Sequence, residues 1–169
     1  MRAGVTGHQK RPGIDWTWVS GSLRQALEGL QPVERLYTCL AAGADQAAAE
    51  VALALDIPIT TVIPMPDYER LYAVAGLAEY RRLKRRGEVL QLPGDPDDEA
   101  AFMAASLKVV DASDVLLAVW DGRAARGFGG TGDVVSHALG AGRRVIHIDT
   151  TTRRVMELPL PKATGGANS

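Results

Sequence analysis

The stretch Asp114-Val-Leu-Leu-Ala-Val-Trp-Asp-Gly122, followed by Arg126-Gly-Phe-Gly-Gly-Thr-Gly-Asp133, is the part of the sequence that decides the fold. Its apolar run Val115 to Trp120 is long enough for a strand buried on both faces of a sheet. A glycine-rich loop follows, and Val134 to Leu139 is typical of the first turns of a helix with Thr131 as its N-cap. A strand, a glycine loop and a helix N-terminus together leave backbone N–H groups for an anion. The stretch therefore predicts a site for a phosphorylated small molecule, with a nucleotide as the first expectation.

Size and composition indicate one globular domain, with 169 residues of which 46% are hydrophobic and 23% charged. The formal net charge of −1 gives no bulk electrostatic reason to expect nucleic acid or an anionic membrane. The N-terminus has no apolar signal region, and no stretch is typical of a membrane span. The single cysteine, Cys39, cannot form an internal disulfide, which favours a reducing compartment. We therefore expect a cytoplasmic protein.

Strands and helices are expected to alternate along the chain. The expected strands are 2–6, 36–41, 59–63, 89–92, 115–120 and 145–148, with 153–158 as an added edge strand. The expected helices are 16–30, 46–55, 68–86, 97–111 and a last one from 134 onward. This alternation predicts a three-layer, doubly wound α/β fold with a mainly parallel sheet in a single domain. Residues 1–161 would form a Rossmann-like nucleotide-binding domain, and 162–169 a disordered C-terminal tail.

Three of the expected strand ends carry small or polar residues. In a doubly wound fold, ligands bind beyond the carboxyl ends of the strands, where the strand order reverses. If the first strand and the Val115 strand are central neighbours, all three loops converge on one crevice. The ligand-binding residues expected there are Thr6, Gly7, His8, Gln9, Ala42, Gly43, Ala44, Asp45, Trp120, Asp121, Gly122, Gly129, Gly130, Thr131, Gly132 and Asp133. The alternative is that each glycine only makes a tight turn.

The glycine loop admits two interpretations. Gly127-Phe-Gly-Gly-Thr-Gly132 matches the dinucleotide pattern G-x-G-x-x-G, and Asp149 lies where a ribose-binding acid would sit. In that fingerprint, however, the first glycine follows the strand directly, whereas Asp121 to Arg126 intervene here. We therefore favour a phosphate nest in which the amides of Gly129 to Gly132 face the anion, and we expect no cofactor.

Three polar residues beside these loops each have a structural and a functional interpretation. Asp133 either stabilises the dipole of the following helix or has a function, as a contact to ribose hydroxyls or as a catalytic carboxylate set off from the phosphate. His8 is either a solvated loop residue or a donor to a phosphate or base. Asp45 is first an N-cap candidate and second a ligand contact.

The one dense basic run is Arg81-Arg-Leu-Lys-Arg-Arg86, which falls at the end of an expected helix, where cations are favoured. We interpret it as a solvated face, because no aromatic platform for nucleic acid accompanies it. His137 and His147 are interpreted as structural. No spacing of His, Cys, Asp and Glu indicates a metal site, and no pair of nucleophile and base is recognisable.

Three sequence blocks resemble the SLOG superfamily, a Rossmann-like group that includes the Lonely-guy phosphoribohydrolases and the DNA-processing protein DprA. The blocks are Gly4-Val-Thr-Gly-His8, Leu40-Ala-Ala-Gly-Ala-Asp-Gln46, and Asp114 through Asp133 with its Trp-Asp-Gly and Gly-Gly-Thr. The resemblance implies binding of a nucleotide or a nucleotide derivative, with the first and last blocks around the phosphate and sugar. It also implies dimers. At the position of the Lonely-guy catalytic glutamate this chain has Val134, with Asp133 one residue earlier.

The first functional expectation is a binding or sensing domain for a nucleotide or other phosphorylated nucleoside derivative. One alternative is a phosphoribohydrolase that cleaves the N-glycosidic bond of a nucleoside monophosphate, with Asp133 and Asp121 as catalytic residues. Another is DprA-like binding of single-stranded DNA, through the basic run of Arg81, Arg82, Arg85 and Arg86. The expected partners are a nucleotide-like small molecule and a second copy of the chain. Neither nucleic acid nor a membrane is expected as a partner.

Overall fold

In the part of the chain that the structure describes, seven strands form one sheet in the order β4-β3-β2-β1-β5-β6-β7, in which only β7 is antiparallel to its neighbour. The computed structural model describes residues 1–30, 32–125 and 129–161. The strands are β1 (Arg2–Gly7), β2 (Arg35–Thr38), β3 (Ile59–Ile63), β4 (Glu88–Gln91), β5 (Val115–Trp120), β6 (Arg144–Asp149) and β7 (Arg154–Glu157). The helices are α1 (Trp16–Gly29), α2 (Ala44–Ala54), the 3₁₀ helix η1 (Tyr68–Leu71), α3 (Val74–Lys84), α4 (Glu99–Ala112) and α5 (Thr131–Gly140).

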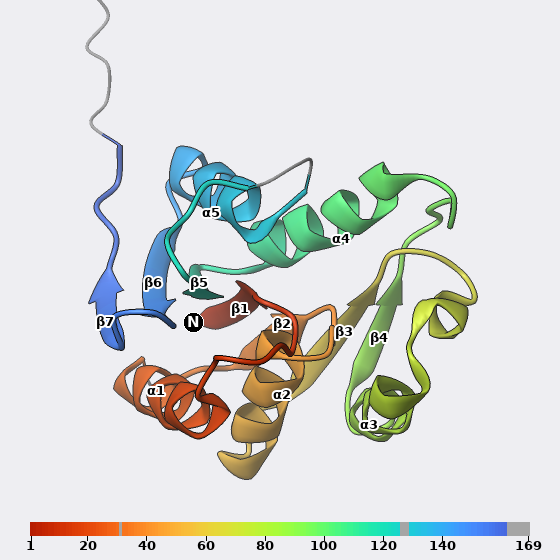
Figure 1. Cartoon of the computed structure of the whole chain (residues 1–169), viewed down its shortest axis with the longest axis horizontal. Helices are drawn as coiled ribbons and strands as arrows, with labels where there is room; N and C mark the ends of the chain where they lie inside the picture. Colours follow the sequence, from red (N-terminus) through yellow and green to blue (C-terminus); the bar gives the residue numbers. More distant parts are fainter. Residues whose placement is uncertain (31, 126–128, 162–169) are drawn as a thin grey trace, which may run out of the picture.

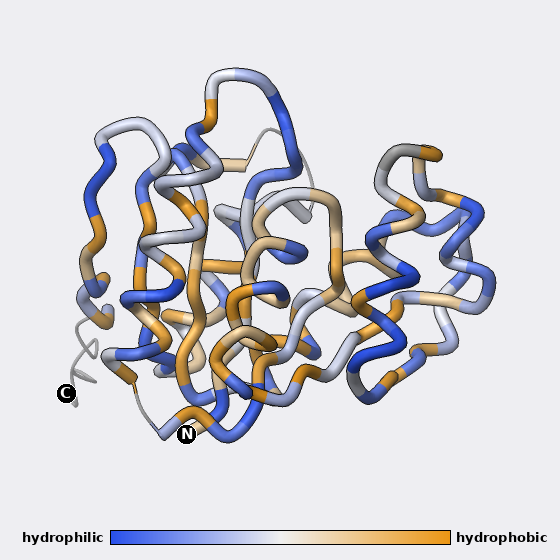
Figure 2. Tube along the Cα trace, turned by 90° about the horizontal axis from the view of Figure 1, so that it is seen from below, coloured by the Kyte–Doolittle hydropathy of each residue, from blue (hydrophilic) through white to orange (hydrophobic). Residues whose placement is uncertain are grey.

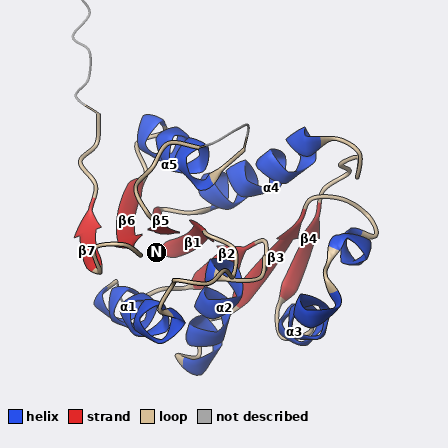
Figure 3. Ribbon diagram, in the orientation of Figure 1, coloured by secondary structure: helices blue, strands red, loops and turns tan. Residues whose placement is uncertain are grey.

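Helices cover both faces of the sheet, so the expected three-layer, doubly wound α/β fold is confirmed. In Figure 1, α1, α2 and α3 lie on one face and α4 and α5 on the other, and Figure 3 shows the strands between these two layers. The expected tail 162–169 lies outside the described residues. None of the described helices combines the length and the apolar character needed to cross a membrane.

The core is divided between the two faces of β5. Val115, Leu117 and Val119 belong to the cluster under α1, α2 and α3. The alternating residues Leu116 and Ala118 belong to the cluster under α4 and α5. All five are 0% exposed, as a strand with both faces covered requires. Figure 2 shows hydrophobic and hydrophilic segments alternating along the trace.

Four local expectations are wrong, and they concern one helix, two N-caps and one strand. The helix expected over 68–86 is broken into η1 and α3, because Ala73 takes an extended backbone with ψ of 144° and the Tyr72 hydroxyl donates to the Leu40 carbonyl. The N-caps are Gly43 for α2 and Gly130 for α5, not Asp45 and Thr131. In both helices the expected cap residue lies inside the first turn.

The strand expected over 36–41 ends at Thr38, because Asp45 binds the backbone that follows it. One carboxylate oxygen of Asp45 accepts from the Cys39 amide at 2.9 Å and from the Thr38 hydroxyl at 3.3 Å. The next residue, Leu40, has a left-handed φ of 57°, which no strand can continue. Burial raises the pKa of Asp45 to about 6, although its hydrogen bonds act in the opposite direction.

Gly7 at the end of β1 is required by close packing. A Cβ atom there would lie 2.4 Å from the Val119 carbonyl oxygen and 2.7 Å from the Cβ of Ala44. Gly7→Ala should therefore lower the free energy of unfolding by about 2 kcal/mol or more. Gly21→Ala is the matched control, because a Cβ at this exposed position in α1 meets no atom within 4 Å. The control should raise stability by roughly 0.5 to 1 kcal/mol in urea unfolding, and equal effects of the two variants would contradict this packing.

Asp45 should also make stability depend on pH. Its folded pKa of about 6 lies above the ordinary aspartate value of 3.8, so this group stabilises the fold below about pH 4 and loses that contribution as pH rises through 6. The difference corresponds to about 3 kcal/mol. Urea unfolding of the wild type and of Asp45→Asn at about pH 4 and pH 7 measures it. The wild type should lose stability relative to the variant as the pH rises, and parallel curves would show that the carboxyl does not titrate in this range.

Candidate functional site

The strand order reverses between β1 and β5, which makes their carboxyl ends the switch point of the sheet. The two strands pair in parallel, with Gly7 opposite Val119, and the His8 amide donates to the Val119 carbonyl at 2.9 Å. The chain leaves β1 for α1 on one face and β5 for α5 on the other. The expectation that these strands are central neighbours is confirmed. A crevice at this edge is where ligands of doubly wound folds bind.

The loop after β1 is fastened to the loop after β2 by backbone hydrogen bonds. The Lys10 amide donates to the Ala42 carbonyl at 2.7 Å, and the Ala44 amide donates to the His8 carbonyl at 3.1 Å. Gln9 and Gly43 form an isolated antiparallel bridge between them. Gly43 has a φ of 125°, and a Cβ there would lie 2.5 Å from the His8 carbonyl oxygen. Glycine is thus required at 43, and backbone hydrogen bonds hold the two loops together. With the loop after β5, they form the rim of the sheet at its carboxyl edge.

His8 reaches across the switch point to Asp121. Its Nε2 accepts from the Asp121 amide at 3.1 Å and lies 3.5 Å from the Asp121 carboxylate, which is also 3.6 Å from the Arg11 guanidinium. Burial and then the charge of Arg11 lower the pKa of His8, while Asp121 acts against them. His8 is therefore a neutral acceptor at its Nε2 near pH 7, and it links the loops after β1 and β5.

The Asp121 carboxylate is held in its ionised form. Burial acts to raise its pKa, but the hydrogen bond from the Arg123 amide and the charges of His8, Arg123 and Arg11 lower the pKa below its usual value. The hydrogen bond from the Arg123 amide nitrogen to the Asp121 carboxylate measures 3.0 Å, and the Asp121 side chain is 18% exposed. This arrangement places one carboxylate, two cations and the neutral His8 ring at the end of β5.

Asp133 turns back onto the glycine loop that precedes α5. Its carboxylate accepts from the Gly129 amide at 3.0 Å, so this amide already has an anionic partner within the chain. Gly132 is buried, and a Cβ there would lie 3.0 Å from the Ala125 amide nitrogen. The Arg126–Phe128 part of the loop lies outside the described residues. An anion in the expected nest would therefore have to take the place of the Asp133 carboxylate at Gly129.

Trp120 closes the β6 side of the site. Its indole Nε1 donates to the Arg123 carbonyl at 2.7 Å, and its ring centroid lies 5.0 Å from that of His147. The His147 Nε2 lies 2.9 Å from the Trp120 carbonyl oxygen. These contacts hold the Asp121–Arg123 turn against the end of β5 and against His147 of β6. The interpretation of His147 as structural agrees with its 6% exposure.

The remaining expected site residues fall into two groups. Thr6, Ala44 and Asp45 are buried, and the Asp45 carboxylate is occupied by the Cys39 amide and the Thr38 hydroxyl. Gly122 and Gln9 are exposed at the rim, with Gly122 in a left-handed conformation at φ 79°. Their roles toward a ligand stay predictions. Three exposed cations at this rim, Lys10, Arg11 and Arg123, were not among the expected site residues.

Those three cations could have been found from the sequence. Lys10 and Arg11 follow a predicted strand end by a few residues, and Arg123 follows Asp121-Gly122 directly. They were missed because the net charge was considered only for the whole chain and not for each loop. Among residues 1–30, 32–125 and 129–161, no three His, Cys, Asp or Glu side chains are grouped so that they could hold a metal ion.

The basic run at Arg81 lies at the other edge of the sheet, because α3 runs from the end of β3 back to the start of β4. Arg81 pairs with Glu69 at 3.0 Å, and Arg82 pairs with Glu79 at 2.7 Å and with Glu50. Arg85 and Arg86, at the end of the run, are exposed. Most of this charge is therefore offset locally, and it lies away from the switch point.

No protein-family model matches the chain, and no curated protein matches it by sequence. Solved structures share its fold. DprA from Streptococcus pneumoniae superposes with a TM-score of 0.62 and 18% identity, covering 86% of this chain and 49% of that one. DprA from Helicobacter pylori, described for its single-stranded DNA binding mode, gives a TM-score of 0.64 and 16% identity, covering 87% of this chain and 64% of that one.

At these identities the likeness establishes the fold alone, a Rossmann-like arrangement shared with the two DprA structures. The chain spans about half the length of the first neighbour and just under two thirds of the second. It also corrects one expectation. Nucleic acid was set aside as a partner because of the net charge of −1, yet a protein of the same fold binds single-stranded DNA. The exclusion was wrong because net charge describes the whole surface, whereas a nucleic acid contacts a local patch.

Proposed function

We propose that the chain binds single-stranded DNA at the carboxyl edge of its sheet, around the junction of β1 and β5. The observation that carries the proposal is the group of exposed cations, Lys10, Arg11 and Arg123, on the two loops that flank the switch point. The shared fold with the Helicobacter pylori protein supports it. This departs from the first expectation, a nucleotide or other phosphorylated nucleoside derivative as the ligand, and favours the DprA-like alternative.

The rim suits a phosphate backbone because its cations stand on fixed main chain. The bond from the Lys10 amide to Ala42 holds the first loop, and the bond from the His8 amide to Val119 holds its base. Arg11 is 51% exposed and shares the Asp121 carboxylate with His8, so its charge is only partly offset. A phosphate oxygen could therefore bind Arg11 without breaking a buried ion pair.

The site proposed for DNA differs from the basic run considered from the sequence. Arg81 and Arg82 are engaged by Glu69, Glu79 and Glu50, and their edge of the sheet carries none of the loops at the switch point. Binding through α3 would also lack the helix N-termini and loop amides that the carboxyl edge provides. Mutations of the cations at the two edges should therefore have opposite effects on DNA binding, depending on which edge binds the DNA.

Neutralising the rim cations should weaken DNA binding. For Lys10→Gln combined with Arg11→Gln, we expect an affinity for a fluorescent oligo-dT that is lower by about tenfold at roughly 0.1 M salt. The slope of log affinity against log salt should become shallower by roughly 0.7 for each lost phosphate contact. Fluorescence anisotropy over a salt series measures both quantities.

The matched control is Arg85→Gln combined with Arg86→Gln, which removes the same charge at the opposite edge. This control should bind the oligonucleotide like the wild type. If the control loses binding and the rim variant keeps it, the DNA face is the end of α3 and the proposed site is wrong. If the wild type shows no salt-dependent binding at all, the proposed function is wrong.

A second candidate is a single nucleotide at the same edge, favoured by the Asp121 carboxylate. An ionised carboxylate that is 18% exposed among cations repels a phosphate but can accept hydrogen bonds from ribose hydroxyls. A mononucleotide could satisfy both groups, with its phosphate at Arg11 and its sugar at Asp121. Cleavage of an N-glycosidic bond by Asp133 and Asp121, and a relation to the Lonely-guy enzymes, stay predictions.

Asp121→Asn separates the two candidates. It removes a negative charge from the rim, so it should strengthen oligo-dT binding several-fold. It should weaken the binding of a ribonucleoside monophosphate by about tenfold, because a charged hydrogen-bond acceptor for the ribose is lost. Isothermal titration with adenosine monophosphate and anisotropy with oligo-dT measure the two effects. Release of free base, lost in Asp133→Asn, would establish the glycosidase; intact nucleotide after prolonged incubation would exclude it for that substrate.

A further inference from the structure

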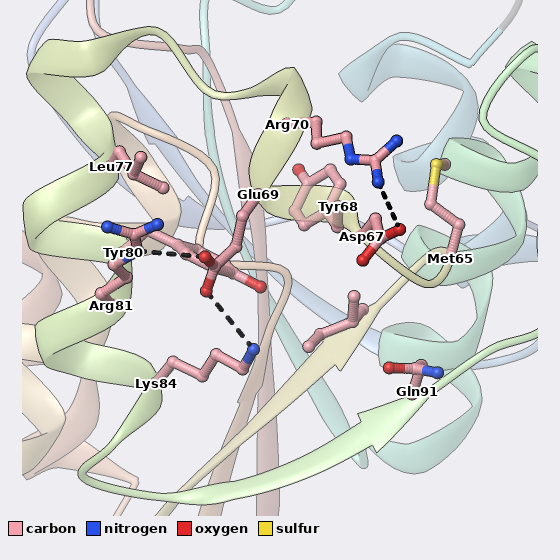
Figure 4. Close-up of a pocket in the computed structure, with 11 residues that line it drawn as sticks. Met65, Asp67, Tyr68, Glu69, Arg70, Leu77, Tyr80, Arg81, Lys84 and Gln91 are labelled. Atoms are coloured by element: carbon pink, nitrogen blue, oxygen red, sulfur yellow. Dashed lines mark hydrogen bonds and ion pairs between the residues drawn. The ribbon is translucent and has the colours of Figure 1, made fainter.

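A cavity of about 480 Å³ lies away from the switch point, between η1, α3 and the ends of β3 and β4. Its size falls within the range of roughly 300 to 1,000 Å³ that is typical of small-molecule sites. Figure 4 shows Tyr80, Arg81 and Lys84 entering it from α3, while Asp67, Glu69 and Arg70 come from the η1 segment. None of these side chains takes part in the DNA site proposed above.

The apolar part of the cavity has aromatic walls. Tyr68 and Tyr80 meet edge to face, with ring centroids 5.7 Å apart, and Leu77 and Met65 complete the lining. Tyr68 is 9% exposed and Tyr80 is fully buried. Such walls would accommodate an apolar or aromatic ligand body.

One polar group in this wall has no partner. The Tyr80 hydroxyl is buried and makes no hydrogen bond to any described residue. Leaving a buried hydroxyl unpaired is costly, so an acceptor inside the cavity would be stabilised by it. Burial and then the charge of Glu69 raise the pKa of Tyr80 to about 12, so the hydroxyl stays protonated and can donate.

The charges that line the cavity favour an anion. Asp67 and Arg70 form their own pair at 3.1 Å. Glu69 alone faces two cations, Arg81 at 3.0 Å and Lys84 at 3.7 Å, and the Lys84 ammonium lies 5.6 Å from the centre of the Tyr80 ring. Two cations that share one carboxylate leave one positive charge beside the unpaired hydroxyl.

We propose that this cavity binds a small monoanionic carboxylate with an apolar or aromatic body. The carboxylate would accept from the Tyr80 hydroxyl and pair with Lys84, while its body packs against Tyr68 and Leu77. Carboxylate oxygens only accept hydrogen bonds, which matches a wall that offers a hydroxyl and an ammonium as donors. The inference is independent of the DNA site.

Phenylacetate is the probe, and its neutral analogue phenylacetamide is the control ligand. We expect phenylacetate to bind saturably to the full chain with a dissociation constant of about 1 mM or below, by isothermal titration, and phenylacetamide to bind at least about tenfold more weakly. Failure of phenylacetate to bind up to about 10 mM, or equal binding of the amide, would overturn the proposal.

Variants of the lining separate the hydroxyl from the charges. Tyr80→Phe removes only an unpartnered hydroxyl, so it should fold like the wild type and bind phenylacetate about tenfold more weakly. Lys84→Met should weaken binding several-fold, and Glu69→Gln, which removes the internal competitor, should strengthen it several-fold. Arg85→Met is the matched charge control, because its neighbour Lys84 lines the cavity and Arg85 does not.

Unchanged binding in Tyr80→Phe would show that the hydroxyl points to no ligand, and the proposal would fall. An equal loss of phenylacetate affinity in Lys84→Met and Arg85→Met would show that the overall positive charge attracts the ligand and that the cavity is no specific site. That result would also overturn the proposal. Phenyl phosphate provides a last comparison: binding more than about tenfold tighter than that of phenylacetate would contradict a monoanionic carboxylate as the ligand class. Oligo-dT binding should be unaffected by Tyr80→Phe.

Discussion

The parallel pairing of β1 with β5 is the constraint on which the rest of the structure depends. It joins two segments that are more than a hundred residues apart, and it places Gly7 against Val119 so closely that no side chain fits between them. That contact puts the His8 amide on the Val119 carbonyl and brings the His8 ring to Asp121. The candidate site exists because these two strands are neighbours whose chains leave on opposite faces.

Charge is distributed unevenly over this framework, and the distribution matters more than the total. Lys10, Arg11 and Arg123 stand at the carboxyl edge on loops that backbone hydrogen bonds hold in place. At the opposite edge, most of the dense basic run is neutralised by Glu50, Glu69 and Glu79. A net charge of −1 is compatible with a cationic rim because nucleic-acid contacts are short-ranged at physiological salt.

Much of the fold could be predicted from local patterns. The strand at Val115 to Trp120 was located to the residue, because five consecutive buried apolar positions have few other uses in a chain of this kind. The break at Tyr72 and the early end of β2 could not be predicted. The first depends on a long-range partner, the Leu40 carbonyl that accepts from the Tyr72 hydroxyl, and the second on the way the Asp45 carboxylate folds back onto the Cys39 amide six residues earlier.

The sequence by itself determined the class of fold, the order of its elements and the three loops that meet at one edge, since apolar periodicity and glycine-rich strand ends are local properties. Only the tertiary structure decided how the side chains of those loops are used. It buried Asp45 against Cys39, turned Asp133 onto the Gly129 amide, and gathered Tyr80, Glu69 and Lys84 around one cavity. The cavity arises from packing between separate segments, and the two short-range carboxylate–amide bonds depend on loop geometry that apolar periodicity does not encode.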